Sequence, residues 1–192
     1  MIRIGILGRI GAGKSYVAKL FGYPVFNADV EVSKLYKKNR KCYKKLKKIL
    51  PDYIKSFPIK KKNLTKAVIN NQKNLKKIIK IIHPEIRTSL EKFVKKNKNK
   101  EFIILDIPLL IENKINQKND ILVFVDAKKK YIDKKLKKKY RGDIKIVNKL
   151  KKFQLGIERK KNKSDFIVKN NFKHKSVKKS VKRVLNKILS NA

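Results

Sequence analysis

The segment GRIGAGKS, residues 8–15, constrains the fold of this chain more than any other feature. Its glycines let the backbone curl so that successive N–H groups point inward, an arrangement that binds phosphate groups. The pattern G-x-x-x-x-G-K-[ST] has this meaning when a buried strand precedes it and a helix follows it. Residues 2–7 are apolar and β-branched like a buried strand, and residues 14–22 have helical spacing that ends at Gly22. The sequence therefore predicts a phosphate-binding P-loop.

The residues of this loop are suited to bind a nucleoside triphosphate together with a metal ion. The ammonium group of Lys14 would reach the β- and γ-phosphates, and the hydroxyl of Ser15 would bind Mg²⁺. The other expected nucleotide contacts lie in the loop and just after it, at Gly8, Gly11, Ala12, Gly13 and Tyr16. The pattern predicts ATP and Mg²⁺ as ligands, but it does not decide between a kinase and another nucleotide-using enzyme.

Four more short apolar runs resemble buried strands and alternate with helical patterns. They are residues 24–29, 102–110, 120–127 and 165–170. Strands that are apolar on both faces and alternate with helices are typical of a parallel sheet between helix layers. We expect an α/β fold with a five-stranded parallel sheet flanked by helices.

Two helical segments interrupt the expected sheet. In residues 31–100 we expect one helix from Val32 to Ile49, ended by Pro51, and further helices near 64–82 and 86–98. We interpret this stretch as an insertion that binds substrate. The lysine-dense segment 128–163 has helical periodicity and resembles a lid, with a turn at 141–143.

The chain of 192 residues is expected to form a single domain. Its core would consist of residues 1–30, 101–127 and 164–192, with a last helix at about 174–190 packed back on the sheet. One cysteine excludes an internal disulfide, and no run approaches the roughly 20 apolar residues of a membrane span. We expect a soluble cytoplasmic protein, and a monomer.

The formal net charge of +41 raises the hypothesis of nucleic-acid binding. Only seven of the 55 basic residues are arginine, and the lysines are spread along nearly every segment. Readout of bases and phosphates favours the planar fork of arginine, whereas Lys, Asn, Ile, Tyr and Phe together are what AT-rich codons favour. We therefore attribute the charge to compositional drift and expect non-specific adhesion to polyanions, with no specific nucleic-acid partner.

Acidic residues follow two of the expected strands. Asp29 could take a proton from an acceptor hydroxyl, or it could cap a helix that begins near Val30. Asp106 could hold Mg²⁺ or orient the acceptor, and Glu112 is better explained as a cap or an ion-pair partner.

Other candidate side chains lie in the helical segments. His83 could contact substrate or cap a helix that has Pro84 in its first turn, and Arg87 could hold a phosphate. Gln154 could face the nucleotide or lie on a helix surface. The cations that could neutralise the transferring phosphate are Arg141, Lys135 and Lys139, although most lysines in this segment would simply be solvated.

Several motifs in this order resemble the dephospho-CoA kinase family. They are GILGRIGAGKS at residue 5, FNAD at 26, IIHPEIR at 81, DIPLLIEN at 106 and SDFIVKN at 164, so the resemblance extends from residue 2 to about 170. The P-loop is shared with many families, but the other motifs at these spacings are much more specific. The resemblance implies a P-loop kinase fold and transfer of the ATP γ-phosphate to the ribose 3′-hydroxyl of dephospho-CoA, giving coenzyme A.

The resemblance also implies roles for individual residues. Asp29 matches the presumed base that activates the hydroxyl, and Asp106 matches the acidic start of D-x-P-L-L-x-E. His83 and Arg87 match the helical region that meets the CoA substrate. In the closing strand, Asp165 and Asn170 match a motif near the nucleotide base.

This chain departs from the family pattern at a few positions. The first Asp of D-A-D is Asn27, the usual Thr after the P-loop serine is Tyr16, and Arg9 stands where glycine is usual. The usual lid arginines fall on Lys135 and Lys139, which keep the charge but lose the planar fork. Two alternatives stay open: another small-molecule or nucleoside monophosphate kinase, and a P-loop protein that has lost catalysis and binds nucleic acid.

Overall fold

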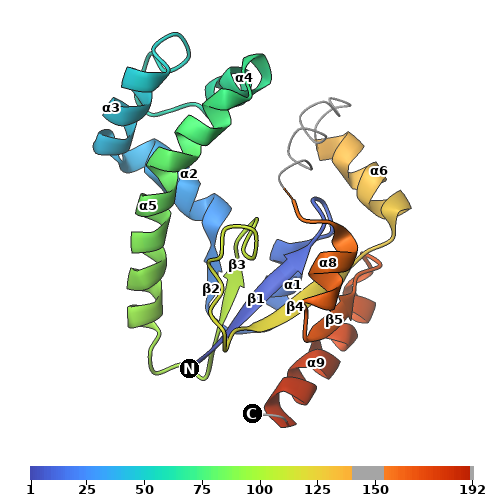
Figure 1. Cartoon of the computed structure of the whole chain (residues 1–192). Helices are drawn as coiled ribbons and strands as arrows, with labels where there is room; N and C mark the ends of the chain where they lie inside the picture. Colours follow the sequence, from blue (N-terminus) through green and yellow to red (C-terminus); the bar gives the residue numbers. More distant parts are fainter. Residues whose placement is uncertain (140–153, 191–192) are drawn as a thin grey trace. The chain divides into compact units, whose positions relative to one another are not determined.

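The computed structural model of the chain describes residues 1–139 and 154–190 (Figure 1). The chain divides into two compact units, which are described separately below. The first comprises residues 1–27 and 97–192, and the second comprises residues 28–96.

A five-stranded parallel sheet forms the centre of the first unit. Its strands are β1 (Ile2–Gly8), β2 (Val25–Asn27), β3 (Phe102–Asp106), β4 (Ile121–Asp126) and β5 (Phe166–Lys169), in the spatial order β2-β3-β1-β4-β5. All four neighbouring pairs are parallel. The predicted number and direction of the strands are confirmed, although β2 ends at Asn27 and β3 at Asp106, before the expected ends at 29 and 110. Because the strands are parallel, their carboxyl ends meet at one edge of the sheet.

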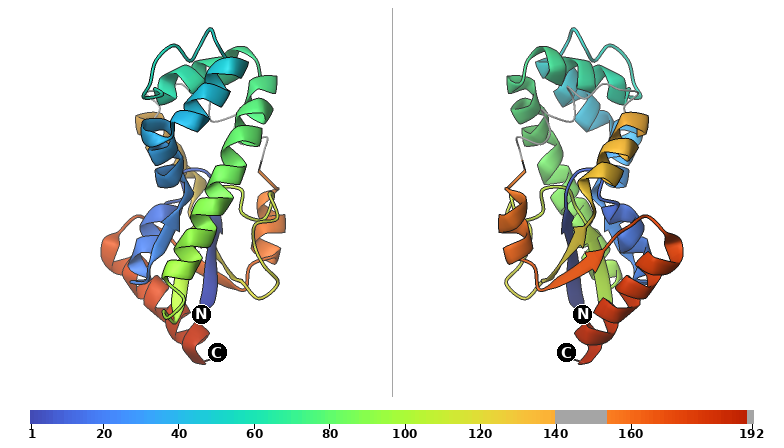
Figure 2. Two further views of the ribbon diagram at one scale, coloured as in Figure 1. Left: turned by 90° about the vertical axis from the view of Figure 1, so that its left-hand side faces the viewer. Right: turned by 90° about the vertical axis from the view of Figure 1, so that its right-hand side faces the viewer.

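Helices cover both faces of this sheet. The helices α1 (Lys14–Leu20) and α9 (His174–Ser190) pack against one face, and α8 (Ile157–Asn162) packs against the other (Figures 1 and 2). On the α1 and α9 side, alternate strand residues meet the apolar stripes of both helices. This cluster includes Ile4, Ile6, Phe102, Ile104, Val123, Val125, Val17, Ala18, Val177, Val181, Val184 and Ile188. The core therefore fixes the end of β1, where the P-loop begins.

The second unit is made of helices. Its elements are α2 (Ala28–Lys38), α3 (Arg40–Ile49), α4 (Lys61–Asn70) and the long α5 (Lys73–Lys96), against which the other three pack. The expected single helix from Val32 to Ile49 is wrong, because the helix is interrupted at Asn39, between α2 and α3. The side-chain oxygen of Asn39 accepts a hydrogen bond from the backbone N–H of Cys42 at 2.8 Å, which caps a new helix.

The expected break near Pro84 is also wrong, since Pro84 lies inside the 24-residue helix α5. Proline removes one backbone hydrogen bond and usually ends or kinks a helix. Here the buried stripe Ile78, Ile82, Ile86 and Leu90 continues at four-residue spacing on both sides of the proline. Packing of this stripe keeps the helix continuous, and His83 lies within the helix, away from either cap.

The expected helical lid, residues 128–163, is only partly described, because residues 140–153 lie outside the described part of the chain. The helix α6 (Lys129–Lys139) follows β4, and α8 follows Gly156. The predicted turn at 141–143, which contains Arg141, lies outside the described residues. Within the described part of the chain, no helix is both long and apolar enough to cross a membrane.

Candidate active site at the P-loop

The P-loop, residues 8–15, leaves β1 at its carboxyl end and leads directly into α1. Its backbone turns through left-handed conformations at Gly11 and Gly13, with φ of 83° and 87°. The ammonium group of Lys14 donates hydrogen bonds to the carbonyl oxygens of Gly8 at 3.2 Å and Arg9 at 3.1 Å. These contacts hold the lysine against the loop, where phosphate oxygens of a bound nucleotide could take over its hydrogen bonds.

The side chain of Asn170 hydrogen-bonds to the backbone of the P-loop. This residue follows β5, is 3% exposed, and donates a hydrogen bond from Nδ2 to the carbonyl oxygen of Ala12 at 2.8 Å. A Cβ atom on Gly13 would lie 2.5 Å from the same nitrogen, so no other residue fits at position 13 without a shift. The family resemblance implies a place for Asn170 near the nucleotide base, and in the structure its amide contacts the phosphate-binding turn at Ala12.

Three polar side chains gather beside the loop. Asn27 and Asp106 are register partners at the carboxyl ends of β2 and β3. The Asn27 amide nitrogen donates to a carboxylate oxygen of Asp106 and lies 3.5 Å from the hydroxyl of Ser15. The sequence singled out Asn27 only as a departure from a family pattern. Its position at the carboxyl end of an expected strand was the feature of the sequence from which a place beside Asp106 could have been predicted.

This cluster has the donor chemistry that Mg²⁺ requires. Magnesium prefers oxygen ligands and commonly binds through one or two carboxylates, with water and substrate phosphates completing its shell. Ser15 offers a hydroxyl and Asp106 a carboxylate that is 3% exposed as a residue. Among the described residues there is no group of three or more His, Cys, Asp or Glu side chains suited to a metal. Ser15 and Asp106 offer oxygen ligands of the kind that Mg²⁺ takes together with substrate phosphates.

Aromatic side chains surround the other side of the loop. The hydroxyl of Tyr16 hydrogen-bonds to Nδ1 of His174, and the two rings meet edge to face at a centroid distance of 6.2 Å. Phe172 has Tyr131 edge-on at 6.2 Å and the ammonium of Lys135 4.8 Å from its ring centroid. No local motif marks His174, Phe172 or Tyr131 in the sequence, and their contacts could not be predicted from it.

A buried ion pair fixes the turn after β3. The Lys160 ammonium lies 2.7 Å from Glu112 Oε1, with the two side chains 4% and 9% exposed. The same oxygen accepts a hydrogen bond from the backbone N–H of Leu155 at 3.0 Å. The interpretation of Glu112 as an ion-pair partner is confirmed. The pair also fixes the residue after Gln154, which is half-buried and precedes α8.

The remaining predicted residues belong to the second unit. Asp29 is exposed in the first turn of α2, which begins at Ala28, so the alternative interpretation of Asp29 as a cap of this helix is wrong. His83 and Arg87 lie one turn apart on α5, and Arg87 is exposed. Burial, and secondly the charge of Arg87, lowers the pKa of His83. At neutral pH the imidazole is therefore uncharged, and Arg87, one turn further along the helix, is positively charged.

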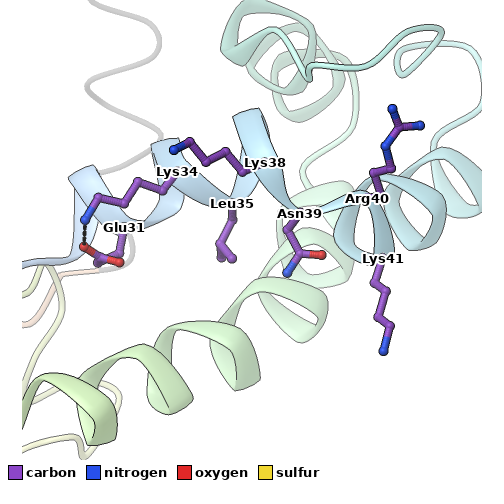
Figure 3. A pocket seen from close by; sticks show the side chains of 7 residues that line it. All are labelled: Glu31, Lys34, Leu35, Lys38, Asn39, Arg40 and Lys41. Carbon is purple, nitrogen blue, oxygen red and sulfur yellow. Dashed lines mark hydrogen bonds and ion pairs between the residues drawn. The ribbon is translucent and has the colours of Figure 1, made fainter.

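A pocket of about 420 Å³ lies on the second unit, between α2 and the start of α3 (Figure 3). It is lined by Glu31, Lys34, Leu35, Lys38, Asn39, Arg40 and Lys41. Lys34 is paired with Glu31 at 2.6 Å, and the Arg40 guanidinium lies 5.3 Å from the ring centroid of Phe57. Arg40 and Lys41 point in opposite directions in Figure 3. Their charges do not converge on a ligand, so the pocket is not the candidate site.

A parallel sheet with a P-loop after β1 and an acidic residue at the end of β3 defines a P-loop nucleotide-binding protein, the class to which P-loop kinases belong. Comparison with known proteins names the family. The sequence matches the model of the dephospho-CoA kinase family over residues 2–176, and the chain belongs to that family.

Relatives that match this chain over nearly their whole length are dephospho-CoA kinases. A dephospho-CoA kinase from Wolbachia pipientis wMel is 31% identical over 190 residues, which cover 96% of this chain and 97% of the relative. One from Bartonella henselae is 30% identical over 199 residues, covering 98% of each chain. The similarity therefore extends over almost the whole length of this chain and of both relatives.

Solved structures share the fold. The chain is similar to the crystal structure of TT1252 from Thermus thermophilus, with a TM-score of 0.78 and 25% identity over 97% of both chains. For a dephospho-CoA kinase from Campylobacter jejuni the TM-score is 0.65 at 22% identity, over 97% of this chain and 96% of the other. A shikimate kinase from Acinetobacter baumannii reaches a TM-score of 0.51 at 12% identity, over 100% and 94% of the chains, which shows a shared fold alone.

Replacement of Asn27 by aspartate should make the stability of the protein depend on Mg²⁺. The new carboxylate would face that of Asp106 in place of a hydrogen-bond donor, and two close carboxylates disfavour their common ionised state. We expect Asn27→Asp to lower the melting temperature in EDTA and Mg²⁺ to restore it, whereas Asn27→Ala should respond to Mg²⁺ like the wild type. Differential scanning fluorimetry measures both. An equal response to Mg²⁺ in all three proteins would contradict this description of the cluster.

His83 should titrate below the usual histidine pKa of about 6.5. Because its folded-state pKa is lowered, the unfolded chain binds more protons in this range, and the free energy of unfolding falls as the pH drops below about 6.5. His83→Gln should weaken that pH dependence. Proton NMR of the imidazole, assigned with the variant, gives the midpoint directly. A midpoint above 6.5 would mean that an acidic group faces the ring.

Proposed function

We propose that the chain transfers the γ-phosphate of ATP to the ribose 3′-hydroxyl of dephospho-CoA, giving coenzyme A and ADP. One observation carries the proposal: hydrogen bonds of Asn27 connect Ser15 of the P-loop to Asp106, in a chain that matches the dephospho-CoA kinase family over residues 2–176. The bond between the 3′-oxygen and the γ-phosphorus forms while the bond from that phosphorus to the β,γ-bridging oxygen breaks.

The residues of the first unit would bind and orient ATP. The loop N–H groups and Lys14 would hold the β- and γ-phosphates, with Gly8, Gly11, Ala12 and Gly13 forming the turn. Ser15 and Asp106 would hold Mg²⁺, which neutralises phosphate charge when bound. Gln154 would border the nucleotide, whereas Tyr16, just after the loop, would act on it through the first turn of α1. Arg141, outside the described residues, is proposed to stabilise charge on the transferring group.

The residues of the second unit would bind dephospho-CoA and activate its hydroxyl. Asp29 is exposed and is separated by a single residue from Asn27 of the P-loop cluster. It is proposed to take the proton from the 3′-hydroxyl. Neutral His83 would exchange hydrogen bonds with the substrate, and Arg87 would pair with one of its phosphates. We further propose that the protein works as a monomer in the cytoplasm. It would adhere to polyanions non-specifically and have no specific nucleic-acid partner.

The acceptor is tested by measuring ADP release from Mg-ATP with a panel of acceptors in moderate salt. We expect release to be stimulated by dephospho-CoA and not by nucleoside monophosphates or shikimate. Stimulation by another acceptor would keep the kinase class and overturn the substrate. ATP binding with no acceptor at all, together with tight and salt-sensitive RNA binding, would favour a P-loop protein that has lost catalysis.

Asp29→Asn should abolish most of the transfer while leaving substrate binding intact. Loss of a general base typically lowers the rate by about 10²- to 10⁴-fold, and the amide keeps the shape of the carboxylate. We expect kcat to fall by at least about 100-fold with both KM values nearly unchanged. Glu31→Gln is the matched control, because Glu31 is in the same helical turn and pairs with Lys34. Unchanged kcat in Asp29→Asn would exclude Asp29 as the base.

A further inference from the structure

The segment 170–174, which follows β5 and ends with the first residue of α9, contacts the P-loop at one point and the first turn of α1 at another. At the first, the buried Asn170 amide donates to the carbonyl oxygen of Ala12 and its oxygen accepts from the backbone N–H of Phe172, each at 2.8 Å. The backbone N–H of Asn170 donates to the carbonyl oxygen of Asp126 at 2.7 Å. The side chain therefore connects the end of the sheet to the interior of the phosphate-binding turn.

At the second point, Tyr16 and His174 connect the first turns of two helices. Tyr16 follows Ser15 in α1, and His174 is the first residue of α9. Their side-chain hydrogen bond and edge-to-face ring contact join residues that are 158 positions apart. Both residues are exposed, with Tyr16 at 37%. The contact therefore contributes little to the core, and its position beside the loop calls for another explanation.

The loop is also enclosed from the side of α6. A Cβ atom at Gly11 would lie 3.0 Å from the Leu136 side chain, and one at Gly13 would lie 3.5 Å from the ring of Phe172. Phe172 itself has a left-handed backbone with φ of 64°, which is uncommon for an aromatic residue. The segment 170–174 therefore keeps an unfavourable local conformation while it contacts the loop.

We propose that Asn170 and the Tyr16–His174 pair are positioning residues for ATP, because they hold the glycine-rich P-loop in its phosphate-binding shape before the nucleotide arrives. Glycine has more conformational freedom to lose than any other residue, so a loop with three positive-φ glycines is costly to order during binding. A loop ordered in advance avoids that cost when ATP binds. This inference rests on the proposed use of ATP and names residues that act on it through the loop.

The test measures the affinity for Mg-ATP by isothermal titration calorimetry in moderate salt, with Lys14→Ala reporting the non-specific binding of ATP by the basic surface. Asn170→Asp keeps the acceptor for Phe172 and replaces the donor to Ala12 by a charged oxygen. We expect this variant to weaken ATP binding roughly tenfold. Tyr16→Phe and His174→Phe remove only the exposed hydrogen bond, and each should weaken binding about threefold.

The double variant separates a connection from two independent effects. If the pair acts as a unit, Tyr16→Phe combined with His174→Phe should bind ATP no more weakly than either single variant. Ser180→Ala is the matched control. Its hydroxyl accepts from the backbone N–H of Lys169 at 3.1 Å, which connects β5 to α9 without contacting the P-loop. This variant should bind ATP like the wild type.

Steady-state kinetics distinguish positioning from general support of the fold. The KM for ATP should rise in the Asn170 and Tyr16 variants, while kcat at saturating ATP and the KM for dephospho-CoA stay nearly constant. A lowered melting temperature with unchanged ATP affinity would overturn the proposal. The surface variant Tyr16→Phe decides the matter if Asn170→Asp does not fold. If the wild type binds ATP but phosphorylates no dephospho-CoA, the proposed function fails, while the comparison of ATP affinities still tests the positioning role.

Discussion

The left-handed glycine backbone of the P-loop is the constraint on which the rest of the active site depends. Gly13 has a left-handed φ of 87°, and the amide of Asn170 occupies the space that a side chain at this position would need. Ile132 and Leu136 of α6 press on Gly11 in the same way. Side chains of α6 and of the segment 170–174 therefore leave no room for a side chain at Gly11 or Gly13 without a shift. A glycine motif that is local in sequence thus depends on contacts that are distant along the chain.

The parallel register of the sheet explains how polar chemistry reaches this loop. Pairing of β2 with β3 aligns Asn27 with Asp106, and pairing of β1 with β3 brings the start of the loop to the same edge. The neutral Asn27 then donates to Asp106 without adding a second negative charge. In a chain of net charge +41, the lysines are spread over the surface, whereas the few acidic groups at this edge have defined partners. We attribute function to this defined edge and not to the diffuse charge.

The sequence predicted the sheet and the P-loop because both depend on local patterns. Buried parallel strands are apolar on both faces, and a phosphate loop needs glycine, lysine and serine at fixed spacing. The helical segment was harder to predict. The cap formed by Asn39 divides one expected helix into two. The packing of Ile82 and Ile86 keeps α5 helical across Pro84, where a break was expected. The contact of Tyr16 with His174 joins two residues 158 positions apart, so it could not be predicted from a local sequence pattern. The roles of Asp29, His83 and Arg87 come from the family resemblance and stay predictions.

Determining which hydroxyl receives the phosphate tests the central claim most directly. The purified product of the reaction of Mg-ATP with dephospho-CoA would be examined by phosphorus–proton correlation NMR. The account predicts one new phosphomonoester signal coupled to the ribose H3′ proton, formed in the same amount as ADP. A signal coupled to H2′, or ADP accompanied by free inorganic phosphate and no new ester, would contradict it.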